Sequence, residues 1–343
     1  MATIVSNVAT ITVANPGTSA LAALAASMER GTWRQLNASG LINFVGGPTS
    51  GVRTGYSDKM AYDPVNKRIY WIGCDHNQAQ VFLQYEEATN AWTVLPATPF
   101  GSPTKHGYNH TTWDTTHGVL YHVPFYERAT RRWNGGSNWT TISWTSVLDY
   151  TGGAIGHEWF PDLGPNGHLM VFSIETVSSG KLIGYDPVVG RWTVFASGNT
   201  LAGAGGYHNV ALYSPVHRLV WFGGGNSSNR MWRIDANGNV AACADIPSAI
   251  GEIGQNESQS LAVCNPANGN FLVLRNSTTW YEYNPMANTW TQRTGTAQVL
   301  AAPTYFSGRS WGTVACPIHP YGVIAFVKGF SGSEPAHMWL FKP

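Results

Sequence analysis

Tyrosine, histidine and arginine side chains recur along this chain, and these residue types can transfer protons and neutralise carboxylates. Tyr108, His157, Tyr207, His208 and Arg309 are the candidates for catalysis. A tyrosine or histidine can abstract a proton next to a uronate carboxylate while an arginine neutralises that carboxylate. This combination is the chemistry of a polysaccharide lyase.

A second set of polar and aromatic side chains accompanies these candidates and would line the same site. The set consists of Tyr56, His106, Asn109, His110, Glu158, Trp159, Glu257 and Trp311. Trp159 and Trp311 offer flat faces on which sugar rings stack. The inner strands of a water-filled channel also begin with polar residues. We therefore expect binding without turnover, and take catalysis as the alternative.

No metal site or cofactor is expected. The cysteines are Cys74, Cys243, Cys264 and Cys316. They form no Cys-x-x-Cys pair, which argues against zinc. We expect small buried hydrophobic side chains at these positions, with a Cys243–Cys264 disulfide as the alternative. A metal would need His157 and His208 to converge from adjacent repeats.

The elements that must position these residues are short strands. Between Met60 and Leu95 the sequence predicts four strands joined by tight connections, which is one blade of a propeller. A tyrosine and a tryptophan with six residues between them mark its outer part. This pair occurs as Tyr85 with Trp92, Tyr185 with Trp192, and Tyr283 with Trp290. A single blade cannot bury both of its faces, so it requires copies of itself.

Alignment of the copies makes six residues equivalent, at steps of 51, 49, 51, 51 and 52 residues. They are Ser57, Tyr108, His157, His208, Gln259 and Trp311. From about Gly31 to Pro343 the chain resembles a kelch-type β-propeller, which has this period and four strands per repeat. The double glycine of that family occurs as Gly223-Gly224. Kelch propellers include sugar oxidases, epimerases, lyases and binding modules, so the resemblance implies the fold and leaves the function open.

We therefore predict an all-β fold, a six-bladed β-propeller of four-stranded antiparallel blades over residues 31–343. The blades are Asp58–Leu95, Asn109–Ser143, Glu158–Phe195, Asn209–Pro247, Ser260–Arg293 and Gly312–Pro343. The last block lacks an outermost strand, and the segment around Trp33 resembles one. The N-terminal strand should therefore complete that blade and close the ring, which leaves no open sheet edge.

Residues 1–30 precede the repeats and form a predicted arm. The sequence predicts a hairpin from Thr3–Val5 and Val8–Val13, then a helix over Ala20–Arg30 capped by Thr18 or Ser19. We expect this arm to dock onto a neighbouring subunit. The alternative is a strut that lies on the side of its own propeller.

Composition narrows the class of function. Charged residues make up 11% of the chain, and the net charge is +1. No basic face for nucleic acid, no apolar run long enough to insert in a membrane and no signal peptide is found. The sequence predicts an extracellular or virion-associated interaction module. It would bind a glycan or a protein through the polar loop face, where the inner strands begin.

Overall fold

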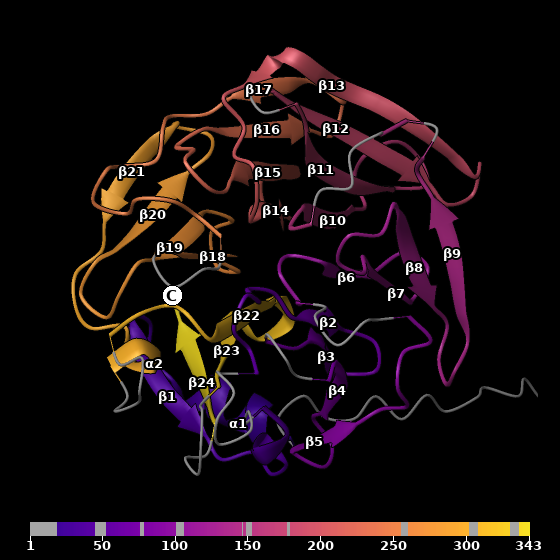
Figure 1. Ribbon diagram of the computed structural model, residues 1–343. Coiled ribbons are helices and arrows are strands. Elements are labelled where there is room, and N and C mark those ends of the chain that lie inside the picture. Colours follow the sequence, from indigo (N-terminus) through magenta and orange to yellow (C-terminus); the bar gives the residue numbers. More distant parts are fainter. Residues whose placement is uncertain are drawn as a thin grey trace, which may run out of the picture.

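Six antiparallel sheets of four strands form a ring around a central axis, in the colour order of the sequence (Figure 1). This computed structural model describes residues 19–44, 53–75, 79–100, 106–145, 147–148, 153–176, 179–254, 260–301, 308–329 and 336–343. The predicted fold class is confirmed. In each of the first five sheets the chain begins next to the axis and adds strands outward.

The first three blades are continuous in sequence. Blade one contains β2 (Ala61–Asp63), β3 (Arg68–Gly73), β4 (Val81–Glu86) and β5 (Ala91–Val94). Blade two contains β6 (Thr111–Asp114), β7 (Val119–His122), β8 (Ala129–Trp133) and β9 (Trp139–Ser143). Blade three contains β10 (Gly156–Phe160), β11 (His168–Thr176), β12 (Ser179–Asp186) and β13 (Arg191–Ala202).

The remaining blades follow the same pattern until the last. Blade four contains β14 (Asn209–Ser214), β15 (Leu219–Gly224), β16 (Met231–Asp235) and β17 (Val240–Ala242). Blade five contains β18 (Leu261–Cys264), β19 (Phe271–Leu274), β20 (Trp280–Asn284) and β21 (Thr289–Gln292). Blade six contains β22 (Thr313–Ile318), β23 (Val323–Lys328), β24 (His337–Lys342) and, outermost, β1 (Thr32–Leu36).

Burial explains the apolar sequence of the middle strands. Every residue of β15, β19 and β23 is buried, because both faces of these strands pack against neighbouring blades. The outermost strands β5 and β21 are largely exposed or half-buried, and they carry polar residues. The core is therefore a set of apolar layers between blades.

The three tyrosine–tryptophan pairs lie directly opposite each other on the third and fourth strands of their blades. Their ring centroids are 5.5, 5.0 and 4.8 Å apart in blades one, three and five. Such cross-strand aromatic pairs stabilise an antiparallel sheet. The predicted pair is therefore a packing motif that fixes the register of the two outer strands.

The ring closes where β1 pairs with β24, as the sequence predicts. The backbone N–H of Gly31 donates to Lys342 O at 2.7 Å, and Trp33 lies opposite Phe341. The Trp33 ring stacks on the Phe341 ring with centroids 4.4 Å apart. Blade six thus contains both early and late parts of the chain.

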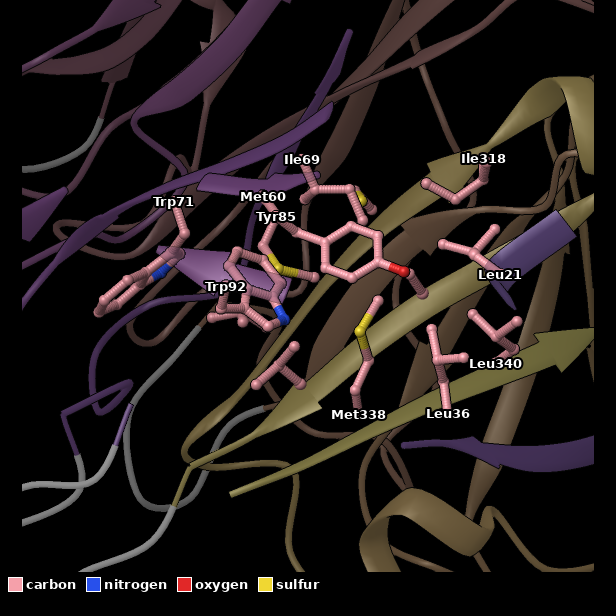
Figure 2. Packing of buried hydrophobic residues seen from close by; sticks show 14 of the residues in the cluster. Leu21, Leu36, Met60, Ile69, Trp71, Tyr85, Trp92, Ile318, Met338 and Leu340 are labelled. Carbon is pink, nitrogen blue, oxygen red and sulfur yellow. The ribbon is translucent and has the colours of Figure 1, made fainter. Parts of the chain in front are cut away.

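Helix α1 (Ala20–Ser27) lies against the seam between blades one and six. The Ser19 hydroxyl caps it by accepting the Ala22 N–H at 3.1 Å. The helix is shorter than predicted because Met28 is already extended, which brings the chain into β1. Leu21 and Met28 belong to the apolar cluster between these blades, part of which Figure 2 shows. Residues 19–28 thus pack on the side of their own propeller, and the predicted hairpin lies outside the described residues.

Within the described residues, three short helical turns connect or flank the strands. They are η1 (Leu41–Phe44), α2 (Gln298–Ala301) and η2 (His319–Tyr321). The outermost strand of blade three extends to Ala202, beyond the predicted end at Phe195, because it stays paired with β12. The four cysteines are buried and none of them is in a disulfide, so the Cys243–Cys264 disulfide does not form.

Candidate functional site

Aromatic and imidazole rings from four blades meet at the end of the axis where the inner strands begin. We call this group the mouth cluster. It consists of Tyr56, His106, Tyr108, Phe125, Tyr126, Tyr207, His208 and Trp311. All but Phe125 and Tyr126 come from segments that enter an inner strand, and these two lie between β7 and β8. Six members were predicted from sequence as site residues.

Tyr108 lies at the centre of the cluster. Its ring centroid is 5.2 Å from His106, 5.2 Å from His208 and 5.1 Å from Phe125. Ring centroids at such separations are typical of packed aromatic pairs. The Tyr108 side chain is buried, so these rings form a continuous floor across blades two and four.

Tyr56 extends this floor towards the last blade. Its centroid lies 4.7 Å from His106, 6.2 Å from His208 and 6.0 Å from Trp311. Tyr56 is half-buried, and Tyr126 is 54% exposed. The cluster therefore presents aromatic surface to solvent above a buried layer of rings.

The backbone of the cluster is held in an unusual conformation. Tyr56, Tyr108, Tyr126 and His208 have φ values of 55°, 38°, 62° and 65°. The left-handed region costs a non-glycine residue about 1–2 kcal/mol. The N–H of Tyr108 donates to Tyr56 O at 2.7 Å, which ties two of these residues together. Strain concentrated in one group of side chains is typical of a functional site.

Burial also fixes the protonation of this site. It raises the pKa of the Tyr108 hydroxyl well above its ordinary value, and the nearby tyrosines add to this effect. Tyr108 is therefore a hydrogen-bond donor at neutral pH and a poor base. The imidazole of His208 lies beside Asn226, with Nδ1 2.9 Å from Oδ1.

His157 does not join the cluster, which corrects the predicted equivalence of six residues. Ser57 and Tyr108 form a parallel bridge and are level, as predicted. In blade three, however, Gly156 bridges Asn109, so His157 lies level with His110. His157 Nδ1 is 2.9 Å from His110 O, and burial lowers the pKa of both imidazoles well below the usual value. Both imidazoles are neutral and fully buried between blades two and three.

Four polar residues, three of them buried and the fourth 13% exposed, join blades one to four across the axis. We call Asp58, Lys59, Asn109 and Glu158 the axial network. Asn109 Nδ2 donates to Asp58 Oδ1 at 3.1 Å, and Asn109 Oδ1 accepts the Ala211 N–H at 2.9 Å. Burial raises the pKa of Asp58 to about 6. Asn109 is thus placed to hold the inner strands together.

The ammonium of Lys59 crosses the axis within this network. It donates to the backbone oxygens of His157 and Ala211 and pairs with Glu158 Oε2 at 3.3 Å. Burial lowers the pKa of Lys59, and the carboxylate of Glu158 opposes that shift. Glu158 also accepts the Tyr213 N–H at 3.2 Å. Glu158 is therefore part of the wall below the mouth cluster.

The other predicted residues lie in three different places. Trp159 is buried against blade two, where its ring lies 5.7 Å from His117 and 6.3 Å from Tyr121. Arg309 is exposed on the loop before β22, and its carbonyl accepts a hydrogen bond from Lys328 Nζ. Glu257 lies outside the described residues.

Phe125 and Tyr126 were missed as site residues. The sequence feature that could have indicated them is a pair of adjacent aromatic residues in a segment that joins two strands. Such connecting segments usually carry exposed polar residues. No group of three or more His, Cys, Asp or Glu side chains arranged for a metal occurs within the described ranges. Nor does any described helix have the length and apolar character needed to span a membrane.

The channel also contains a cavity of about 530 Å³ at its opposite end, on the face of the tight turns. Glu158 and Trp159 line it, together with prolines of those turns such as Pro64 and Pro215. This turn-face cavity was not anticipated, since the sequence prediction placed the site at the loop face. The axial network lies between the cavity and the mouth cluster.

No family profile matches the sequence, and no curated protein matches it either. Solved structures do match. A chain of the nidogen/laminin complex matches with a TM-score of 0.50 and 10% identity, over 71% of this chain and 81% of that one. A streptogramin B lyase matches with a TM-score of 0.52 and 10% identity, over 87% and 80%.

A third match is virginiamycin B lyase from Staphylococcus aureus, with a TM-score of 0.50 and 11% identity over 87% of this chain and 82% of that one. These proteins differ in function, and their sequence identities are too low to transfer any of it. What this chain shares with them is the β-propeller fold.

Proposed function

We propose that this protein is a non-catalytic binding module of kelch type that takes a glycan at the mouth cluster. The observation that carries the proposal is the meeting of eight aromatic and imidazole rings from four blades, with strained backbone at four of them. Aromatic faces stack on the apolar faces of sugar rings, and the neighbouring hydroxyl and imidazole groups supply hydrogen bonds. A protein partner that offers a flat polar surface is the other ligand class for this face.

The protonation states of the candidate catalytic residues favour a binding module over an enzyme. A lyase needs a base at neutral pH, and the burial of Tyr108 and His157 makes both unsuited to that role. A polysaccharide lyase remains the second candidate, because Tyr207, His208 and Arg309 lie on the same face. Its base would be Tyr207 or His208.

A setting outside the cell or in a virus particle accords with the low charge of the chain. Charged residues are 11% of the sequence, against about 25% in typical soluble domains. The first 18 residues carry no charged side chain. Docking of a neighbouring subunit through residues 1–30 is part of this proposal.

The test is a panel of neutral and uronate-rich polysaccharides, read for bound protein and for unsaturated products in the same wells. Binding without product, lost about tenfold in Tyr126→Ala and Tyr207→Ala, supports the module. The control is Met286→Ala, which removes an exposed side chain from a tight turn of blade five. Product formation that His208→Ala abolishes would establish the lyase instead. Absence of both signals would contradict the glycan proposal.

A further inference from the structure

We propose that the turn-face cavity is a second binding site, and that its ligand is an uncharged, largely apolar small molecule. The cavity measures about 530 Å³, within the range of small-molecule sites. It is reached from the opposite face of the ring to the mouth cluster. The proposal therefore stands independently of the glycan function.

Four aromatic side chains at one level of the ring form the walls. Tyr62, Trp113, Trp159 and Tyr213 line the cavity, and each is the second-last residue of its inner strand. The repeat thus places an aromatic residue at the same height in blades one to four. Large aromatic surfaces provide most of the affinity of apolar pockets.

Several polar atoms of the walls are already paired within the protein, whereas the indole N–H of Trp159 is buried without a hydrogen-bond partner among the described residues. The hydroxyl of Tyr62 donates to Glu87 at 2.9 Å, and the hydroxyl of Tyr213 donates to Asp162 at 2.6 Å. Thr111 Oγ1 lies 2.9 Å from His122 Nδ1. A sugar would have to give up its hydration for few new hydrogen bonds here, whereas an apolar molecule gives up little.

The inner end of the cavity is closed by the axial network. Glu158 lines the cavity and pairs there with Lys59, and it also accepts hydrogen bonds from Thr112 and two backbone N–H groups. The charges of this pair compensate each other. A ligand that enters from the turn face thus meets a floor whose charges are compensated.

The remaining titratable groups on the lining are neutral at physiological pH. His319 lies at an exposed position on the lining, and partial desolvation lowers the pKa of its imidazole, which is uncharged at physiological pH. Burial raises the pKa of the Cys264 and Cys316 thiols, which therefore stay protonated. A charged ligand would find no unpaired countercharge on this lining, and its desolvation would be uncompensated.

Rigid apolar residues surround the entrance. Pro64 and Pro215 line the cavity, and each is followed by an exposed valine: Val65 is 79% exposed and Val216 is 54% exposed. Proline in these turns restricts the backbone before a ligand arrives. The entrance is thus formed in advance and extends the apolar wall outward.

The probe for this site is N-phenyl-1-naphthylamine, an uncharged naphthyl fluorophore, titrated into the full-length protein. We expect saturable one-to-one fluorescence enhancement. Its sulfonated relative, 8-anilinonaphthalene-1-sulfonate, should bind at least about tenfold more weakly. No saturable binding of the neutral probe, or equal affinity for the charged one, would overturn the proposal.

Two pairs of variants locate the probe. Thr115 lines the cavity and is exposed, so Thr115→Trp can cover the entrance and should weaken binding at least about tenfold. Thr89→Trp makes the same change in an exposed turn of blade one outside the lining, and should leave binding unchanged. Equal affinity in the two variants would refute the assignment.

The second pair of variants tests the same entrance in case Thr115→Trp does not fold. Val65→Asp with Val216→Asp places two charges at the entrance on exposed positions. Val188→Asp with Val189→Asp places the same charges in an exposed turn of blade three that does not line the cavity. Only the first double variant should lose probe binding. Because Tyr207→Ala should not affect the probe, failure of this site and failure of the glycan proposal are distinguishable.

Discussion

The hydroxyl of Ser19 donates a hydrogen bond to Glu87 Oε2 at 3.0 Å, joining the start of α1 to a turn of blade one. The same carboxylate accepts the hydroxyl of Tyr321 from blade six at 2.9 Å and that of Tyr62 at 2.9 Å. Burial raises the pKa of both tyrosines, and Glu87 raises it further, so both remain donors. One buried carboxylate thus fastens the helix and both blades of the closure seam.

Removal of the Ser19 hydroxyl should loosen the helix. Ser19→Ala deletes both the helix cap and a bond to Glu87, so we expect a loss of about 1–2 kcal/mol in unfolding free energy. Protease cleavage near α1 should become faster in the folded protein. The matched control is Glu86→Gln, which removes a surface ion pair with Arg68 and should cost under about 1 kcal/mol. Equal effects in both variants would contradict the role of Ser19.

Lys59 should be essential to the stability of the inner ring. Lys59→Met leaves the Glu158 carboxylate without its cation, which costs about 3–5 kcal/mol when a buried pair is broken. Adding Glu158→Gln should recover part of that loss, and urea unfolding of the four proteins in this cycle measures the coupling. Additive losses would show that the two side chains do not act as a pair. Arg34→Met, at an exposed position, serves as the control.

Lys328 should make the protein more stable as pH rises above 7. Burial lowers the pKa of this lysine to about 7, and its ammonium donates to the carbonyls of Arg309 and Trp311. The unfolded chain then binds more protons than the folded chain between pH 7 and the ordinary lysine pKa, so unfolding free energy increases with pH. The increase is about 1 kcal/mol between pH 7 and 8.

Urea midpoints of the protein and of Lys328→Met at pH 7 and pH 8 check this prediction. The urea midpoint of Lys328→Met, minus the midpoint of the unaltered protein, should decrease from pH 7 to pH 8, because only the unaltered protein gains stability from the lysine. A constant difference would mean that Lys328 has an ordinary pKa. The comparison stops at pH 8 because ionisation of the buried thiols adds an opposite trend above it.

Replacement of Lys67 by glycine should stabilise the fold. It has φ 55° in the turn between β2 and β3, and Gly118, Gly269 and Gly322 occupy the corresponding place in other blades. Lys67→Gly should gain about 0.5–1 kcal/mol, since glycine adopts this conformation without strain. Thr89→Gly, at a turn residue whose own φ is not positive, should gain nothing. Thermal unfolding of both variants measures this difference, and equal unfolding temperatures would contradict the prediction.

The repeat predicted the ring well because its signals are local. Neighbouring residues alone determine the Tyr85–Trp92 pair and the turn after Asp63. The strand around Trp33 follows from the need to pair the one open sheet edge of the last blade. These are features that spacing and residue type express directly. Blade number, blade order and closure therefore followed from the sequence.

The positions of the site residues along the propeller axis could not be predicted from the sequence in the same way. The bridged residues Ser57 and Tyr108 are 51 apart in the chain, whereas the bridged residues Asn109 and Gly156 are 47 apart. Because this step is shorter, counting by a period of about 50 residues placed His157 at the mouth, whereas its side chain lies between blades two and three. The turn-face cavity was missed because an aromatic residue near a strand end also reads as core.

The pairing of β1 with β24 has a consequence for how the protein is made. Thr32 finds its partner in Lys342, at the far end of the chain. Loop closure over such a separation is slow, and β24 is synthesised after every other strand of the ring. Strand β1 therefore stays unpaired until β24 has been made. In that interval it is open to capture by the equivalent strand of another nascent chain, so chaperone supply during translation should govern the yield of closed rings.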